Sequence, residues 1–500
     1  MPSQKTKKVY LIYTCNNPLY PYFPSSSLSL AGVLLKSGYS PVIIDSELED
    51  WRKYDLSDAL CVCVSTFTGP WLGSALKITA EIKRKYPGIK VFWGGPHSIA
   101  LPEVTAKHPL IDAVCHTEGE NVITGLVNAV YGGTEDYSGI KGIIFRDKSG
   151  RIVQNEPPEV VDLDTLDLPP YGLLNLKLYS VKHGRIYYQS SRGCPYRCRF
   201  CVCENRTKWR GMSPEKVISD FKKIEELFAP EEIQVFDGNF FANPERVRKI
   251  LSLKVQNGID FNWSAYCRFD TVARFSDRDL ELLKQSKCTE LKFGGESASP
   301  KILKYIDKET KPEWIAEGVR RTMKHGIIPT LSFMTGFPVE TEADLNITLD
   351  TINSLKKEFP AIEINGLFML QHLPNTPLTQ EVIEKYGIRQ PDTLEKWVTH
   401  HMTWTTRSDY PWMTDREYSL RKTLSSIIGY QYVSDVLTRM SESQRKGTIL
   451  RSKLLFGLFR LTDMIVRNIF IPLRWDRRIV FLPVEWRIWD FIRKQVLRTA

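Results

Sequence analysis

Three cysteines stand close together near the middle of the chain, at Cys194, Cys198 and Cys201. Their spacing, C-x3-C-x2-C, places three thiols on one short loop that Gly193 and Pro195 shape into a tight turn. Thiolates are soft ligands, which select iron–sulfur clusters, zinc or copper(I). Because three thiolates on a cubane of four irons leave one iron open for a further ligand, the pattern favours a [4Fe–4S] cluster.

A zinc site is the alternative interpretation of this triplet, together with reduced thiols that bind no metal. A structural zinc ion takes four ligands, usually supplied as two pairs. Cys203 is a fourth nearby thiol, but its C-x-C geometry with Cys201 is awkward, and we interpret Cys203 as a bystander.

Size and composition narrow the class of protein. A length of 500 residues predicts about three domains, and 42% hydrophobic residues is ordinary for a globular protein. Ten cysteines indicate a reducing compartment rather than a disulfide scaffold, because the first apolar run, Val9–Thr14, is too short for the core of a secretory leader. We therefore expect a cytoplasmic protein.

The first domain is expected at residues 5–135. Apolar strand candidates alternate there with helix candidates, which predicts a Rossmann-like α/β domain with a buried parallel sheet. The strands are expected at Val9–Thr14, Pro41–Asp45, Ala59–Ser65, Val91–Gly94 and Ala113–His116, and the helices at Ser27–Ser37, Leu72–Tyr86 and Asn121–Tyr131.

Polar residues and glycines follow three of these strands. Ligands of parallel sheets bind beyond the carboxyl ends of the strands, and glycine lets a bulky ligand approach the backbone. The candidate binding residues are Ser65, Thr66, Gly94, Gly95, His97, Glu118 and Gly119. No G-x-G-x-x-G motif follows the first strand, so a dinucleotide site is not expected.

Residues 136–180 are predicted to form a linker with a small hairpin, at Gly142–Arg146 and Arg151–Gln154. Repeated strand–helix units follow over residues 181–385 and predict a partial (β/α)6 barrel of TIM type, whose first strand delivers the cysteine loop. The barrel strands are expected at Tyr187–Ser190, Ile233–Phe236, Asn262–Tyr266, Glu290–Phe293, Ile328–Phe333 and Glu363–Met369.

Residues 386–500 lose this rhythm and are predicted to be mostly helical, with helices around Asp415–Ser441 and Thr448–Asn468. A charged stripe within Leu454–Leu473 argues against a transmembrane span. From residue 445 onward, 13 Lys and Arg stand against 4 Asp and Glu, interleaved with aromatic residues. We expect this region either to pack on the barrel as a helical bundle or to lie peripherally at the anionic inner surface of a membrane. Nucleic acid is a third candidate partner of this basic region, but no other feature of the sequence supports it.

The cysteine loop resembles that of the radical S-adenosylmethionine (radical SAM) family, including Phe200, which packs near the adenine in that family. The resemblance covers roughly residues 187–380. It implies that the open iron binds the amino and carboxylate groups of S-adenosylmethionine, whose reductive cleavage yields a deoxyadenosyl radical. It further implies that Asp237 and Asn239 meet the amino end of that cofactor, that Arg268, Glu296 and Ser297 meet its carboxylate and ribose, and that Gly336 and Pro338 flank its adenine.

The first domain, placed before such a loop, resembles the cobalamin-binding domain of cobalamin-dependent radical SAM proteins. The likeness rests on Gly94-Gly95-Pro96-His97 and Glu118-Gly119-Glu120. The classical Asp-x-His-x-x-Gly motif is absent, since Cys15-Asn16-Asn17-Pro18 follows the first strand, so that loop supplies no lower cobalt ligand. His97 is an alternative ligand, although we expect it to pack against the corrin or its tail. A degenerate sheet that binds no cofactor is the other interpretation.

These resemblances imply a cobalamin-dependent radical SAM enzyme. We expect a methyltransferase for an unactivated carbon, with a small molecule, or a lipid or isoprenoid, as substrate. The implied cofactors are a [4Fe–4S] cluster, S-adenosylmethionine and cobalamin, and the implied partner is an electron donor such as flavodoxin or ferredoxin. A cyclase that forms a carbon–carbon bond with the same cofactors is one alternative, and a non-catalytic cobalamin or iron–sulfur sensor is another. The sequence assigns no catalytic residue.

Overall fold

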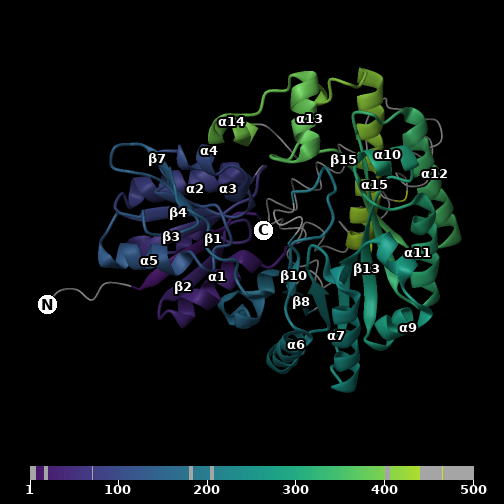
Figure 1. The fold of residues 1–500 in the computed structure, drawn as a ribbon, viewed down its shortest axis with the longest axis horizontal. Helices are drawn as coiled ribbons and strands as arrows, with labels where there is room; N and C mark the ends of the chain where they lie inside the picture. The colour runs from purple at the N-terminus through teal and green to yellow at the C-terminus, as the bar shows by residue number, and fades with distance from the viewer. Residues whose placement is uncertain are drawn as a thin grey trace. The chain divides into compact units, whose positions relative to one another are not determined.

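The computed structural model describes residues 7–15, 21–69, 71–179, 184–202, 208–399 and 406–439, together with Met464. The chain divides into two compact units. The first comprises residues 1–181, 373–375 and 389–404, and the second comprises residues 182–372, 376–388 and 405–500. Each unit contains a sheet of mainly parallel strands that alternate with helices (Figure 1).

Seven strands form the sheet of the first unit, in the order β2-β1-β3-β4-β5-β6-β7. Their bounds are β1 Lys8–Tyr13, β2 Ser40–Asp45, β3 Ala59–Ser65, β4 Lys90–Gly94, β5 Ala113–Cys115, β6 Ile143–Arg146 and β7 Ile152–Gln154. β1 to β5 are parallel, whereas β6 and β7 add antiparallel strands at one edge. The hairpin predicted within the linker thus joins this sheet, because β6 is apolar and buries Ile143, Ile144 and Phe145.

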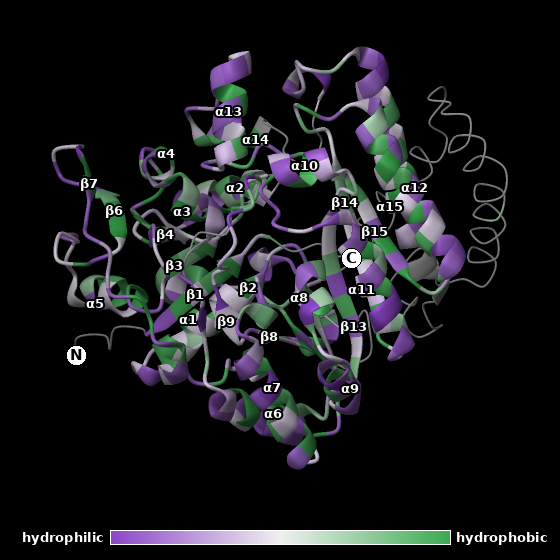
Figure 2. Ribbon diagram, turned by 45° about the vertical axis from the view of Figure 1, so that its right-hand side comes forward, coloured by the Kyte–Doolittle hydropathy of each residue, from purple (hydrophilic) through white to green (hydrophobic). Residues whose placement is uncertain are grey.

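Helices cover both faces of this first sheet. α2 (Trp71–Lys85) and α14 (Leu394–Thr399) contact each other and share a core with one face of the strands, whereas α1 (Ser25–Lys36) and α5 (Ile123–Gly132) contact each other and the strands β2 and β3. The short helices α3 (Pro96–Ala100) and α4 (Pro102–Ala106) follow β4. The strands β1, β3 and β4 are largely apolar, as expected for a sheet covered on both faces (Figure 2).

Six parallel strands form the main sheet of the second unit, in the order β15-β14-β13-β12-β11-β8. The strands are β8 Arg185–Tyr188, β11 Glu232–Val235, β12 Asn262–Cys267, β13 Cys288–Glu296, β14 Ile328–Thr335 and β15 Glu363–Met369. The helices between them are α6 Pro214–Phe228, α7 Pro244–Gln256, α8 Phe269–Arg274, α9 Asp277–Gln285, α10 Pro300–Tyr305, α11 Pro312–Lys324 and α12 Glu342–Glu358. This is the predicted partial barrel.

The strands of the barrel alternate between an apolar and a polar face. Ile233, Val235 and Leu291 are fully buried, whereas their neighbours Gln234 and Lys292 carry polar side chains that hydrogen-bond each other at 3.0 Å. In barrels of this type the apolar face packs against the surrounding helices and the polar face lines the interior. All six carboxyl ends meet at one edge of the sheet, and this edge carries the cysteine loop after β8.

Helices dominate the described part of the C-terminal region. α13 (Pro377–Tyr386) and α14 precede α15 (Asp415–Arg439), which packs along β15 (Figure 1). Among the described residues, no helix is long and apolar enough to span a bilayer. Apart from Met464, the helix predicted at Thr448–Asn468 and the basic segment 445–500 lie outside the described residues. The predicted fold class, a Rossmann-like domain followed by a partial barrel and helices, is confirmed.

Candidate active site

The cysteine loop is held at both of its stems. β9 (Ser191–Arg192) and β10 (Arg210–Gly211) pair antiparallel and close the segment that carries the three cysteines. Arg246 of α7 donates from Nε to the carbonyl oxygen of Met212 at 2.6 Å and from Nη2 to that of Ser190 at 3.0 Å. Because one buried guanidinium binds both stems, it fixes the base of the loop.

Asp237, which follows β11, binds the first residues of the same loop. Its Oδ1 accepts the backbone N–H of Ser190 at 2.6 Å, and its Oδ2 accepts the hydroxyls of Ser190 at 2.7 Å and Ser191 at 2.6 Å. Burial raises the pKa of Asp237, and the hydrogen bonds from Ser191 and Ser190 act against that rise. The carboxylate therefore orients the loop stem, while its predicted contact with S-adenosylmethionine stays a prediction.

Two N–H donors reach the cysteine sulfurs. Asn239 Nδ2 lies 3.8 Å from the Sγ of Cys194, and Arg268 Nη1 lies 3.8 Å from the Sγ of Cys198. Burial raises the pKa of Cys198, whereas the charges of Lys308 and Arg268 lower it. Cations and N–H donors stabilise thiolates, and hydrogen bonds to cluster sulfurs tune the reduction potential.

The residues of the loop fit an iron–sulfur cluster. Cys194, Cys198 and Cys201 belong to no disulfide and are partly exposed. Within the described ranges, no three His, Cys, Asp or Glu side chains converge as the ligands of one metal ion would. The thiolates of a cubane bind different irons, so they do not need to converge on one point. Cys203, the fourth thiol considered for zinc, lies outside the described residues.

Arg268 is itself fixed by several partners at the end of β12. Its Nε donates to Asp270 Oδ1 at 2.7 Å, and its Nη2 donates to the carbonyl oxygen of Lys308. Its guanidinium stands 3.4 Å from the ring centroid of Tyr196, whose hydroxyl donates to Asp270 at 2.8 Å. The arginine thus ties the end of β12 to the cysteine loop through a cation–π contact and shared hydrogen bonds.

Glu296 and Ser297 are both predicted to contact S-adenosylmethionine, but their side chains have different neighbours in the structure. Glu296 is buried at the end of β13 with φ +59°, and its Oε1 accepts Lys308 Nζ at 2.7 Å. A positive φ is uncommon for a residue with a side chain and indicates a position fixed by its surroundings. Ser297 is fully buried, with its Oγ 3.1 Å from Thr348 Oγ1 of α12. Only Glu296 lies with the residues around Cys198.

Phe200 and the segment Gly336–Pro338 meet at one apolar cluster. Phe200 packs against a buried group that includes Phe337, the residue between Gly336 and Pro338, and also Ile302 and Met369. Gly336 has φ +95°, which favours glycine. The structure therefore places Phe200 in the same apolar cluster as Phe337, the neighbour of the two predicted adenine contacts Gly336 and Pro338.

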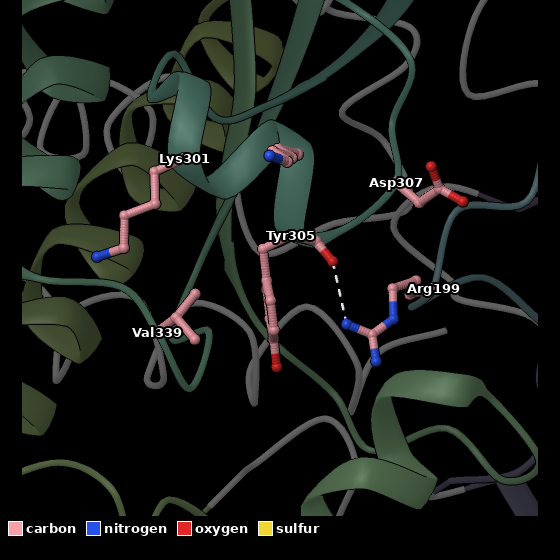
Figure 3. Close-up of a pocket in the computed structure, with 6 residues that line it drawn as sticks. Arg199, Lys301, Tyr305, Asp307 and Val339 are labelled. Carbon is pink, nitrogen blue, oxygen red and sulfur yellow. Dashed lines mark hydrogen bonds between the residues drawn. The ribbon is translucent and has the colours of Figure 1, made fainter.

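An open groove with a volume of about 480 Å³ lies beside the cysteine loop. It is lined by Arg199, Lys301, Lys304, Tyr305, Asp307 and Val339 (Figure 3). Arg199 stands between two of the cysteines, donates to the carbonyl oxygen of Tyr305 at 3.2 Å and pairs with Glu381 at 2.6 Å. Lys301 pairs with Asp344 at 2.9 Å, while Lys304 is exposed and forms no ion pair within the described chain.

In the first unit, the predicted ligand residues gather where β3 and β4 end. The N–H of Thr66 donates to the carbonyl oxygen of Gly94, and the N–H of His97 donates to that of Thr66, each at 3.2 Å. Gly95 has φ +89°, and a Cβ there would lie 2.8 Å from Ser65 Oγ and 2.9 Å from the carbonyl oxygen of Thr66. Glycine is required for this close approach of the two strand ends.

The turn after β5 packs against α1. A Cβ on Gly119 would lie 2.9 Å from Leu30 Cδ2, and Glu120 accepts the hydroxyl of Ser29 at 2.5 Å. Glu118, which is half-buried, precedes this contact. The predicted residues Glu118 and Gly119 are thus placed at the same carboxyl edge of the sheet, beside the helix that follows β1.

His97 is fully buried, with its Nδ1 2.8 Å from Thr68 Oγ1 and its ring at 6.2 Å and edge-on to the ring of Trp397. Burial lowers the pKa of His97 to about 4, so the imidazole is neutral at pH 7. Its Nε2 has no hydrogen-bond partner among the described residues. His97 is predicted either to bind cobalt or to pack against the corrin or its tail, and packing suits this enclosed ring better. A polar group of a bound cobalamin would then satisfy the Nε2 atom.

Several residues that build these sites carry no sequence signal. Three of them lie at the cysteine loop: Arg246 on α7, Lys308 in the segment after α10, and Tyr196 within the loop. A fourth, Trp397, packs against His97 from a segment 300 residues further along the chain. Their spacing matches no motif. Their roles depend on pairs that only the folded chain brings together.

Comparison with known proteins agrees with this architecture. The model of the radical SAM superfamily matches residues 188–352. An uncharacterized methyltransferase of Pyrococcus horikoshii is 31% identical over 355 residues, 68% of this chain and 75% of that protein. An anaerobic magnesium-protoporphyrin IX monomethyl ester cyclase of Synechocystis is 24% identical over 64% of this chain and 66% of its own. The cobalamin-dependent radical SAM methyltransferase TokK of Streptomyces tokunonensis is 26% identical over 63% of this chain and 47%, about half, of its own length.

Two solved structures share the fold. The radical S-adenosylmethionine methyltransferase TsrM of Kitasatospora setae, solved with cobalamin and a [4Fe-4S] cluster, has a TM-score of 0.64 at 19% identity and covers 77% of this chain and 76% of its own. The cobalamin-dependent S-adenosylmethionine radical enzyme OxsB, solved with aqua-cobalamin and S-adenosylmethionine, has a TM-score of 0.70 at 17% identity. The match covers 99% of this chain and 80% of that protein.

The family match and the relative from Pyrococcus horikoshii define the class of protein to which this chain belongs. The chain is a member of the radical SAM superfamily of enzymes. The proteins that it resembles include cobalamin-dependent members of that superfamily, the kind of relative that the sequence predicted.

We predict that replacing any one of Cys194, Cys198 and Cys201 by alanine abolishes cluster assembly. Anaerobic reconstitution of the wild type should yield about four irons per chain, and each variant should hold less than about half of that with little visible absorbance. The matched control is Cys288→Ala, a buried thiol within β13. Full iron content in a loop variant, or zinc in place of iron in the wild type, would contradict the assignment.

His97 should make the stability of the protein depend on pH. Its folded-state pKa is about 4, below the ordinary value of about 6.5, so the unfolded chain binds more protons as the pH falls. This stability is fully present above pH 6.5 and is lost toward pH 4. Between pH 7.5 and 5.5 the wild type should lose about 1.4 kcal/mol more unfolding free energy than His97→Phe. If urea titrations show the same loss of unfolding free energy in both proteins, the predicted role of His97 is wrong.

Proposed function

We propose that this protein is a cobalamin-dependent radical SAM methyltransferase that acts on an unactivated carbon of a small molecule. The observation that carries the proposal is the cysteine loop, which stands at the carboxyl edge of a partial barrel and is surrounded by Asn239, Arg268 and Lys308. The preceding Rossmann-like unit, with its glycine-bearing strand ends, supports cobalamin as the third cofactor.

The chain's own residues prepare the site for this chemistry. When bound, the cluster supplies the electron that cleaves S-adenosylmethionine, and cobalamin carries the methyl group. Asp237 and Arg246 hold the loop stems, while Asn239 and Arg268 donate toward two cluster thiols. Phe200 packs against the buried apolar cluster around Phe337, where the adenine is expected to lie. The first unit presents Thr66 and His97 at its sheet edge.

A cyclase that forms a carbon–carbon bond is the second candidate, and the cyclase of Synechocystis favours it. The methyltransferase is preferred because the relative with 31% identity is named a methyltransferase. A sensor without catalysis is a third class, but the ordered set of polar residues around the cysteine loop argues for turnover.

Turnover with S-adenosylmethionine labelled in its methyl group distinguishes the three functions. The reconstituted, reduced protein should be incubated with both cofactors and a small-molecule extract of anaerobic cells. A methyltransferase yields deoxyadenosine together with labelled product. Deoxyadenosine without labelled product indicates the cyclase, and no cleavage of S-adenosylmethionine contradicts both enzymes in favour of the sensor. The same assay with Cys198→Ala is the control, since it removes a cluster ligand.

We also propose that an acidic electron donor, a flavodoxin or a ferredoxin, docks at the groove beside the cysteine loop. Arg199 belongs to the loop itself, so a donor bound there would stand close to the cluster (Figure 3). Lys304 is exposed and forms no ion pair among the described residues, so its charge is available to a partner, whereas Lys301 is half-exposed and pairs with Asp344. Complementary charges raise the rate of association more than the final affinity.

We predict that Lys304→Glu slows deoxyadenosine formation driven by a reduced acidic flavodoxin by about 3- to 10-fold at low salt, and that the defect shrinks at high salt. Adding Lys301→Gln should enlarge it. The rate with dithionite should not change, because a small reductant needs no docking surface. Lys223→Glu on α6 is the control for a reversed charge elsewhere on the second unit. Equal slowing by Lys304→Glu and Lys223→Glu would remove the groove as the docking site.

A lipid or isoprenoid substrate and a peripheral membrane contact stay predictions of the basic segment 445–500. That segment lies outside the described residues except for Met464. Its excess of Lys and Arg over Asp and Glu, with aromatic residues between them, supports attraction to anionic lipid surfaces.

A further inference from the structure

A buried ion pair joins the C-terminal helix α15 to the end of β14. Arg421 and Glu340 have side chains that are each 1% exposed, and Arg421 Nε donates to Glu340 Oε2 at 3.2 Å. Arg421 Nη2 also donates to the backbone carbonyl oxygen of Glu340 at 3.3 Å, and its Nη1 donates to that of Glu417 at 3.4 Å. The arginine thus binds both the side chain and the backbone of one glutamate.

Glu340 uses its carboxylate to hold the turn that precedes it. Its Oε2 accepts the N–H of Gly336 at 2.6 Å and the hydroxyl of Thr335 at 2.7 Å. Burial raises the pKa of Glu340, and the charge of Arg421 is the largest effect opposing that rise. The ion pair therefore favours the ionised carboxylate, which accepts hydrogen bonds more strongly than a neutral carboxyl group.

Residues just before α15 hold the other side of the same turn. Trp412 Nε1 donates to the carbonyl oxygen of Gly336 at 3.2 Å. The hydroxyl of Tyr410 donates to the carbonyl oxygen of Leu370 at 2.6 Å, and a Cβ on Gly336 would lie 3.3 Å from the Tyr410 ring. Both backbone groups of Gly336 are thus bound, one by Glu340 and one by Trp412.

This arrangement is more than is needed to stabilise a fold. A buried ion pair is weak evidence for stability, because the cost of removing two charges from water offsets their attraction, and apolar residues of similar volume serve as well. A role in fixing the backbone geometry of one segment would account for a buried ion pair at this position. The geometry fixed here is that of Gly336–Pro338, the segment expected to flank the adenine, whereas Arg421 and Trp412 lie outside the matched range 188–352.

We propose that Arg421 is a positioning residue for S-adenosylmethionine, acting through Glu340 and supported by Trp412. The helix α15 then sets the affinity for the nucleoside part of the cofactor without touching it. This inference rests on the proposed function, since it assumes that the chain binds S-adenosylmethionine. It assigns to the C-terminal region a role in the binding site of the barrel.

The test measures binding of S-adenosylhomocysteine to the reconstituted protein by calorimetry, together with KM for S-adenosylmethionine and the rate at saturation with dithionite. Arg421→Met should weaken binding roughly 10- to 100-fold and raise KM in parallel, since a small displacement of a positioning segment is costly. The rate at saturation should change far less. Trp412→Phe, which removes one hydrogen bond, should weaken binding roughly two- to tenfold.

Two further variants separate positioning from folding. Glu340→Gln combined with Arg421→Met leaves no buried charge while keeping an acceptor for Gly336, so it should recover part of the lost affinity. Arg320→Met breaks an exposed pair with Glu358, 2.9 Å apart, and should leave binding unchanged. Wild-type affinity in folded Arg421→Met and in Trp412→Phe would overturn the inference. A wild type that binds neither S-adenosylhomocysteine nor S-adenosylmethionine would instead overturn the proposed function.

Discussion

The buried carboxylate of Asp237 is the constraint on which the cysteine loop depends. It follows β11, and its Oδ1 accepts from Ser190 while its Oδ2 accepts from Ser190 and Ser191, which follow the neighbouring strand β8. A loop that must leave three thiols free for a metal cluster cannot use those side chains to hold its own shape. The stems are fixed instead by the carboxylate of Asp237 and by the guanidinium of Arg246, which both bind Ser190. The polar side chains at the strand ends thus hold the loop in place, in addition to any contact that they make with a cofactor.

Sequence patterns are sufficient for the strands of both main sheets, and they suggest the chemistry of the loop. The alternation of apolar runs with helices, and the spacing of Cys194, Cys198 and Cys201, depend only on local order, which is what periodicity and motifs report. The hairpin at Ile143 was recognised as a hairpin but not as an edge of the first sheet, because its pairing with β5 joins segments separated along the chain. Strand pairing of this kind carries little local signal.

The partners of the predicted site residues could not be read from the sequence. Arg268 is predicted, with Glu296 and Ser297, to meet the carboxylate and ribose of the cofactor, and only the structure shows that Tyr196, Asp270 and the backbone of Lys308 hold it. Ser297 follows Glu296 directly, but the two side chains have different neighbours, since Glu296 accepts from Lys308 and Ser297 Oγ lies near Thr348 of α12. Which of two adjacent polar residues lies near the cysteine loop depends on these distant partners, and no motif reports them.

The C-terminal region belongs to the cores of both units. Residues 389–404 place Trp397 and Leu394 in the core of the first unit, where Trp397 packs against His97. Residues from 406 onward place Tyr410 and Arg421 in the second unit, against the end of β14. Since each contact is buried, neither unit would keep its strand-end geometry if this region were replaced by an unrelated sequence. A region outside the radical SAM match can therefore influence the geometry of the strand edges in each unit.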